Sequence, residues 1–258
     1  MEIWKDIPNC EGRVNYMTTN FRTVKAEEID VRVAQIEKTW CTLLLYKDAR
    51  VDQNILDETV GQMNWQRHHS RDNANCIVSI WDENKNQWVE KEDTGVESFS
   101  QAEKGLASDS FKRACFNWGI GRELYTAPSI FVLPRKDMGK IRKPDEEANE
   151  FFEKNGKYTT KTKFYVDYID YDENRNIQDL IIRDHKGNIR FEQLTEKAQK
   201  EKNKEFLKLR ELIQKNEDKD DNFDRAEFYK YFKVDSDSQL NSKQIKVAMD
   251  LLEKRLKK

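Results

Sequence analysis

The stretch GLASDSFKRACFNWGIGRELY, residues Gly105–Tyr125, predicts a buried helix that ends in a tight turn. Apolar residues recur along it at helical spacing, and such a stripe must face a core. The stripe consists of Ala107, Phe111, Ala114 and Trp118. Gly119 stands where a left-handed residue commonly ends a helix. The opposite face carries the three cations Lys104, Lys112 and Arg113.

The segments around this helix alternate in hydrophobicity with a period of two. They predict strands over Asn64–Ser70, Cys76–Trp81 and Gln87–Lys91, and the polar DENKN segment joins the last two as a hairpin. The apolar segment Pro128–Pro134 follows the helix. The economical packing of this order is an α+β, β-β-β-α core, with the helix laid across an antiparallel meander.

Three further elements are predicted before the meander. Ala26–Lys38 has Ile29, Val33 and Ile36 at helical spacing, which favours a short amphipathic helix. Trp40–Tyr46 is a continuous apolar run typical of a buried strand. Asp48–Gly61 returns to helical spacing, with Asp48 as N-cap and Gly61 as stop.

The second half of the chain predicts an extension and a tail. Strand patterns at Lys163–Tyr171, Asp179–Asp184 and Asn188–Glu192 indicate a small β-meander, and Leu194–Asn216 an exposed helix. Ala226–Lys258 indicates a small helical module, tethered rather than packed into the first core. With a boundary in the basic run Arg135–Lys143, the expected domains are residues 1–143, 144–200 and 201–258.

Composition narrows the class of protein. Charged residues make up 36% of the 258 residues and the formal net charge is −2, so no overall basicity indicates nucleic acid. A basic surface must therefore come from segregation of charge onto one face. Four widely spaced cysteines, Cys10, Cys41, Cys76 and Cys115, suit reduced thiols in a cytosolic protein. No secretory leader and no membrane-spanning run is recognised in the sequence.

Motifs for enzymatic chemistry are weak. The chain has no phosphate-binding P-loop, and the charged Asp218–Asp224 run lacks the central Gly and closing Glu of a calcium loop. His68, His69 and Cys76 suggest a metal site, but neighbouring strand residues point to opposite faces, so only one histidine can join Cys76. We therefore expect no catalytic residue, metal or cofactor, and keep a metal-dependent nuclease as a minor alternative.

The basic residues on the organising helix are better candidates for a binding site. Cations beside aromatic side chains are the usual basis of sequence-independent single-strand binding. The alternative for Arg113 is a pair with Asp109, four residues before it, whereas Lys112 has Ser108 at that spacing. Arg50 begins a helix, where a cation is unfavourable. Arg67, Arg71, Arg135 and Lys136 either extend a basic path or are ordinary surface charge. The candidate aromatics are Trp65, Trp81, Trp88, Trp118 and Tyr125, most of which are expected in the core.

Three separated motifs resemble one family. SDSFKRACFNWG (Ser108–Gly119) resembles the DNA-facing helix of the Rad-fifty-two superfamily of single-strand annealing proteins, and is most similar to its phage-encoded Sak-type recombinases. ARVDQNILDETVGQMNW (Ala49–Trp65) resembles the family's Arg-led helix, and WVEKEDTG (Trp88–Gly95) its third strand and Asp-x-Gly exit. Together they cover roughly residues 26–134.

The resemblance implies a function and site residues. It implies a β-β-β-α core, assembly into rings or open helical oligomers, and ATP-independent annealing of single-stranded DNA. Lys112 and Arg113 match the pair that holds the inner strand, and Arg50 matches the groove floor. Eukaryotic members carry another Arg where Phe116 stands here, and Arg122 or Lys104 would compensate.

The hypothesis from sequence is therefore a phage or prophage annealing protein acting in the bacterial cytoplasm. Residues 226–258 resemble small tails that dock a partner exonuclease or the host single-strand-binding protein. The alternative is a non-annealing recombination or replication accessory, or a scaffold protein, that acts through this C-terminal module.

Overall fold

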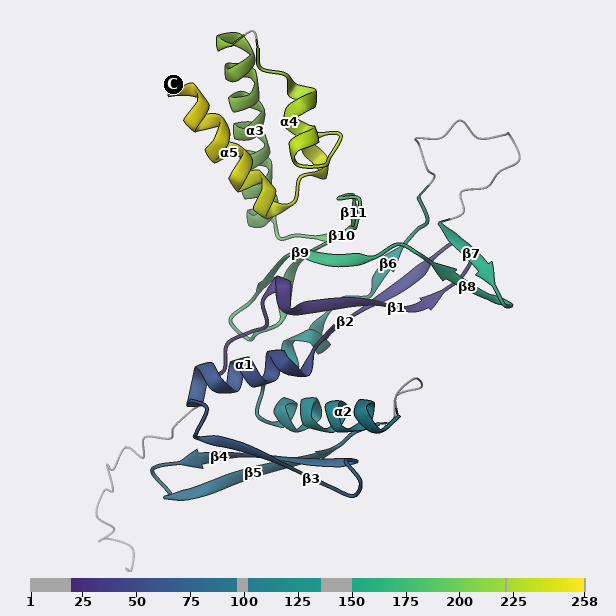
Figure 1. Ribbon diagram of the computed structural model, residues 1–258, viewed down its shortest axis with the longest axis vertical. Coiled ribbons are helices and arrows are strands. Elements are labelled where there is room, and N and C mark those ends of the chain that lie inside the picture. Colours follow the sequence, from purple (N-terminus) through teal and green to yellow (C-terminus); the bar gives the residue numbers. More distant parts are fainter. Residues whose placement is uncertain (1–19, 97–101, 136–149, 221, 258) are drawn as a thin grey trace, which may run out of the picture. The chain divides into compact units, whose positions relative to one another are not determined.

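A computed structural model describes residues 20–96, 102–135, 150–220 and 222–257 (Figure 1). The chain divides into two compact units. The first holds residues 20–22 and Asp52–Gly119, and the second holds Thr23–Val51 and Ile120–Lys258. Both contain helices and antiparallel strands, so the predicted α+β class is confirmed.

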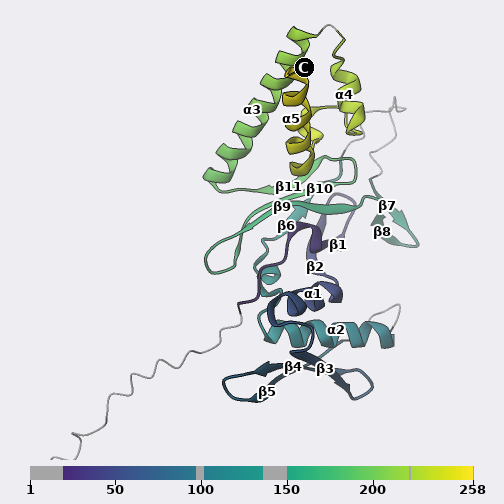
Figure 2. The same ribbon diagram turned by 60° about the vertical axis from the view of Figure 1, so that its left-hand side comes forward.

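The first unit contains the predicted meander and helix. Strands β3 (Trp65–Ser70), β4 (Asn75–Asp82) and β5 (Gln87–Thr94) form an antiparallel sheet in that order. Helix α2 (Ala102–Asn117) lies along one face and contacts β4 and β5 (Figure 2). The core between them contains Cys76, Val78, Ile80, Phe111 and Ala114, all buried. Gly119 has φ +95°, as expected of the residue that ends this helix.

Helix α1 (Ala49–Val60) begins and ends as predicted. The Asp48 carboxylate accepts a hydrogen bond of 2.7 Å from the Arg50 backbone N–H, which satisfies one of the unpaired donors of the first turn. Gly61 has φ +83°, and its N–H donates to the Asp57 carbonyl. The left-handed backbone that glycine adopts readily therefore stops the helix.

The helix predicted over Ala26–Lys38 is wrong. A single 3-10 turn, η1 (Ala26–Glu28), leads into strand β1 (Ile29–Ile36), which pairs with β2 (Cys41–Lys47). Ile29, Val31 and Val33 also alternate with a period of two, and β-branched residues favour strands. The segment therefore suits both a helical and a strand periodicity, and its pairing with β2 makes it a strand.

The second unit is built on a six-stranded antiparallel sheet. Its order is β11-β10-β9-β1-β2-β6, and the added strands are β6 (Ile130–Val132), β9 (Phe164–Tyr171), β10 (Ile177–Asp184) and β11 (Ile189–Gln193). The short 3-10 helix η2 (Arg122–Thr126) precedes β6. Because strands from both sides of residues 135–143 share this sheet, the boundary predicted there falls inside one compact unit.

The two edge strands of this sheet approach each other. β6 and β11 are in contact, and the Arg190 guanidinium on β11 donates a 2.8 Å hydrogen bond to the Leu133 carbonyl just after β6. The sheet therefore curls strongly. In contrast, β1 and β9 share a single register pair, Asp30 with Tyr165.

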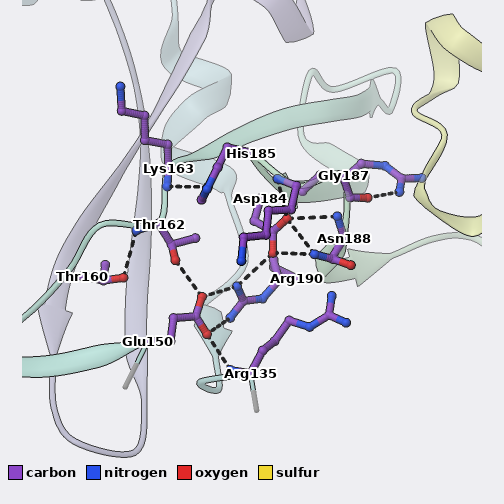
Figure 3. A network of polar contacts seen from close by, with 12 residues as sticks. Arg135, Glu150, Thr160, Thr162, Lys163, Asp184, His185, Gly187, Asn188 and Arg190 are labelled. Carbon is purple, nitrogen blue, oxygen red and sulfur yellow. Dashed lines mark hydrogen bonds and ion pairs between the residues drawn. The ribbon is translucent and has the colours of Figure 1, made fainter. Parts of the chain in front are cut away.

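A cluster of buried charges fixes β11. Arg190 lies between Glu150 and Asp184 (Figure 3), with its Nη1 3.2 Å from Asp184 Oδ2 and its side chain 2% exposed. Asn188 donates to Asp184, and Thr162 to Glu150. One guanidinium is bound by both carboxylates, and the carboxylate oxygens accept further hydrogen bonds, so these charges are tolerated away from water.

One hairpin was not predicted. Strands β7 (Phe151–Lys154) and β8 (Lys157–Thr160) are joined by Asn155 and Gly156. Both turn residues have positive φ, 53° and 74°. An Asn-Gly pair between two short strands is a strong hairpin signal, so the sequence did contain the information.

The C-terminal helices form a bundle with its own core. α3 (Glu196–Lys219), α4 (Arg225–Tyr231) and α5 (Ser242–Leu256) surround Leu209, Leu212, Ile213, Phe232, Leu240, Ile245, Ala248 and Leu252, with η3 (Asp237–Gln239) between α4 and α5. The bundle is not part of the β3-β4-β5-α2 core, and it docks on the six-stranded sheet of the second unit. Arg183 of β10 donates to the Ser238 carbonyl, and the Ser242 N–H donates to Asp167 of β9.

Candidate nucleic-acid interface

The segment after β5 touches helix α2 at backbone level. A Cβ added at Gly95 would lie 2.5 Å from the Ser110 nitrogen and 2.8 Å from the Leu106 carbonyl oxygen. The Gly95 N–H donates to the Ala74 carbonyl, and the Val96 N–H to the Asp109 carboxylate. Two of the sequence motifs, Trp88–Gly95 and Ser108–Gly119, therefore meet here, and glycine is the residue that permits the approach.

The two motif cations are paired differently from the sequence expectation. Asp109 lies 3.9 Å from Lys112 Nζ, whereas Arg113 Nε lies 3.2 Å from Asp93 on β5. Asp109 also accepts from the Val96 N–H, which holds its carboxylate toward the segment after β5, away from Arg113. The Lys112 and Arg113 side chains are 28% and 46% exposed, so these pairs are screened by water and weak.

The structure adds Lys91, which the sequence analysis did not select. Arg67 on β3 and Lys91 on β5 both pair with Val78 and so share the helix-covered face of the sheet. Arg67 lies over the Phe111 ring at 4.9 Å, and Lys91 over the Trp118 ring at 4.4 Å. Lys91 is on β5, the strand that also pairs with Arg113 through Asp93. Arg67 is on β3, and β4 lies between β3 and β5. The signal in sequence was strand alternation, which sets Lys91 between the inward positions Val89 and Asp93.

Charge on the sheet is segregated by strand alternation. Glu90 and Glu92 pair with Ser79 and Ile77, on the face opposite to Val78. Acidic side chains outnumber basic ones between Asp52 and Gly119. Because these two carboxylates are turned away from the helix, the cations remain concentrated on the helix side of β5.

The other predicted cations are dispersed. Arg71 is an exposed turn residue with φ 50°. Arg50 is 82% exposed, and its guanidinium makes two 3.0 Å hydrogen bonds to Asp48, which raise its pKa. Arg50, Arg122 and Arg135 belong to the second unit, where Arg122 and Arg135 are exposed. The side chain of Lys104 and all of Lys136 lie outside the described residues.

Most of the candidate aromatics are used in packing, as expected. Trp65 stacks on Phe111, and Trp118 donates its indole N–H to the Val78 carbonyl. Trp81 and Trp88 form an edge-to-face pair with ring centroids 5.5 Å apart, and Trp88 is 38% exposed. Tyr125, in the second unit, is 78% exposed.

Near His69, the Ser110 hydroxyl is used in backbone hydrogen bonds. The buried Ser110 hydroxyl donates to the Asn73 carbonyl, 3.0 Å away, and is 3.5 Å from His69 Nδ1. Burial, and then the charges of Arg67 and His68, lower the pKa of His69. Within the described residues no group of three or more His, Cys, Asp or Glu side chains could hold a metal ion.

The buried thiols give a test of both units. Burial raises the pKa of Cys41 and of Cys76 from 9.0 to about 11. Since the thiolate is the nucleophile, iodoacetamide at pH 8 should label both only after local opening. The favourable contribution of the neutral thiols to stability is complete below pH 9 and is lost as pH rises toward 11. Mass spectrometry of the alkylated peptides checks the expected protection from iodoacetamide, with denatured protein as the control. Labelling of the native protein at the rate of the denatured protein would contradict the expected protection.

Comparison with known proteins leaves the family open. No protein-family model, curated protein or solved structure matches the chain. Of the helices in the described part of the chain, none is long and apolar enough to cross a membrane.

Proposed function

We propose that this protein binds single-stranded DNA and anneals complementary strands without ATP, as a recombination protein of a phage or prophage in the bacterial cytoplasm. The observation that carries the proposal is the junction at Gly95, where two of the three motifs that resemble the family contact each other. The β3-β4-β5-α2 order adds support, because it is the order that the resemblance implies.

The chemistry is phosphate neutralisation beside the helix. Lys112 and Arg113 are in weak, partly exposed ion pairs, and a phosphate can replace the carboxylates Asp109 and Asp93 as their partners. Lys91, which donates to the Asn117 carbonyl, adds positive charge beside them. Release of counterions from the DNA then drives binding without regard to sequence. Oligomers in rings or open helices would align many such sites along one strand and leave its bases available for pairing.

The primary test is annealing of two complementary fluorescent oligonucleotides without ATP or metal. We expect the wild type to accelerate annealing and Lys112→Ala/Arg113→Ala to lose the acceleration. DNA affinity should fall about tenfold. The slope of log K against log salt concentration should become shallower by about 2, which corresponds to the loss of about two phosphate contacts. Arg113→Ala also removes the Asp93 pair, so stability is measured in parallel; its expected loss is at most about 1 kcal/mol.

A single substitution separates phosphate binding from general loss of charge. Lys112→Ala should weaken DNA binding, whereas Lys85→Ala at the β4–β5 hairpin should not. The two lysines are matched, since each follows its paired aspartate by three residues. Equal effects of the two substitutions on DNA affinity would argue against a site on α2.

A second candidate function, an accessory or scaffold that acts through the C-terminal bundle, is favoured by one feature. The bundle has an open groove of about 1010 Å³ between its helices. DNA binding that is weak and produces no annealing would favour this alternative.

A further inference from the structure

The groove in the helical bundle has an apolar floor. Its lining residues come from the C-terminal ends of α3 and α5, from α4 and from the segment before α4. Figure 1 labels these three helices. The floor consists of Phe223, Phe228 and Leu252. Buried Asn216, at the same place, already donates its amide N–H groups to the Leu212 and Leu252 carbonyls. An occupant therefore meets mainly carbon atoms at the bottom of the groove.

The floor is firmly held, whereas the mouth is exposed. Phe228 packs against Phe223 and Phe232, with ring centroids 5.8 and 5.3 Å apart. At the opening, Tyr231 is 70% exposed and Leu251 is 40% exposed. Large apolar side chains gathered around a concave surface are characteristic of interaction sites.

The rim of the groove is basic. Of the described residues that line it, Lys219, Lys254, Arg255 and Lys257 are cations and Asp220 is a carboxylate. Asp220 is already paired with Arg255, whose guanidinium also lies over the Phe223 ring at 5.3 Å. Lys254 is paired with Asp250. With both carboxylates counted, the rim still has an excess of positive charge around an apolar floor, although the whole chain has a net charge of −2.

We propose that this groove binds an acidic peptide segment of a partner protein. Bulky apolar side chains of the segment would lie on the phenylalanine and leucine floor, and its carboxylates beside the basic rim. Charge complementarity of this kind supplies specificity and speeds association. The proposal does not depend on whether the first unit anneals DNA.

A peptide fits the groove better than nucleic acid does. The Phe223 and Phe228 rings are partly buried and tilted by 46° against each other, so they offer no flat, open platform for stacked bases. The polar edges of a base would lose hydrogen bonds to water over a carbon-lined floor. Leucine and phenylalanine side chains carry no such cost.

The test begins with selection from a random peptide library against the full-length protein. We expect enrichment of peptides that combine Asp or Glu with Phe, Leu or Trp. The best peptide is then labelled with a fluorophore, and its affinity is measured by fluorescence anisotropy. Enrichment of basic peptides, or no enrichment, would overturn the proposal.

Two variants locate the peptide on the groove. Leu251→Glu should lower the affinity about tenfold or more through the lost apolar contact. Lys254→Glu/Lys257→Glu should do so through charge reversal, with the larger loss at low salt. Circular dichroism verifies that each variant is folded, and the exposure of the three side chains favours this.

Matched controls use the N-terminal half of α3. Leu207, which is 60% exposed, and the exposed Lys197 and Lys200 do not line the groove. Leu207→Glu and Lys197→Glu/Lys200→Glu should leave the affinity within about twofold of the wild type, as surface changes outside an interface do. If the control variants lost as much affinity as the groove variants, an acidic peptide would be rejected as the specific occupant. The same conclusion would follow if a single-stranded oligonucleotide displaced the peptide from the wild type but not from Leu251→Glu.

Discussion

Substitution of Arg183 by alanine should lower the free energy of unfolding by about 3–5 kcal/mol, because it leaves a buried carboxylate without its counter-charge. Arg183 Nε lies 2.7 Å from Asp167 Oδ2, and the two side chains are 2% and 3% exposed. Its Nη1 donates to the Gly187 and Ser238 carbonyls, so the same side chain joins β10 to the helical bundle.

Chemical denaturation followed by tryptophan fluorescence and circular dichroism measures this loss. Arg50→Ala is the control, because the Arg50–Asp48 pair has the same charges but Arg50 is 82% exposed, and its removal should leave stability nearly unchanged. Arg183→Lys keeps the charge and should fall between wild type and alanine. Equal stabilities of Arg183→Ala and Arg50→Ala would show that burial of the ion pair is unimportant.

Gly95→Ala should be the most damaging small substitution in the first unit, with an expected cost of about 3 kcal/mol. The added methyl group meets the backbone of α2 at Ser110 and Leu106, where no side-chain rotation can relieve the contact. The helix must move away from β5, which weakens the Arg113–Asp93 pair. DNA binding should decline together with stability.

Gly119→Ala provides the contrasting control. A Cβ there would have nothing within 4 Å, but φ is +95°, so the cost is conformational alone and about 1 kcal/mol. Thermal and chemical unfolding of the two variants distinguish a steric effect from a backbone effect. If Gly95→Ala cost no more than Gly119→Ala, the close approach of α2 to β5 would be disproved.

The β-β-β-α arrangement was predictable because its signals are local. Alternating hydrophobicity indicated the three strands. An apolar stripe indicated the helix, and Gly119 indicated where the helix ends. The partner of Arg113 was not predictable in the same way, because Asp93 is twenty residues away and faces the helix only once the register of β5 is fixed. Asp109 had the correct helical spacing from Arg113, but its carboxylate accepts a hydrogen bond from the Val96 N–H, which lies outside the helix.

Long-range strand order was beyond the sequence pattern. β1 and β9 are separated by more than a hundred residues, and no local feature indicates that they pair. The periodicity of Ala26–Lys38 suited helix and strand alike, and only the neighbouring β2 resolved it. The bundle was predicted from its helices, whereas its docking depends on Arg183 and Asp167, whose burial could not be read from their positions in the chain.

The single register pair between β1 and β9 gives the six-stranded sheet a weak seam. Backbone amides on either side should exchange with solvent as two cooperative groups, one containing β1, β2 and β6 and the other containing β9, β10 and β11. Further connections between these groups are made by side chains around Arg190 and by contacts of β9 and β10 with η1 and η2, such as the Arg175–Glu123 ion pair. Partial opening of the sheet would therefore start at the β1–β9 seam, and a protease that samples opened states should cut beside it first.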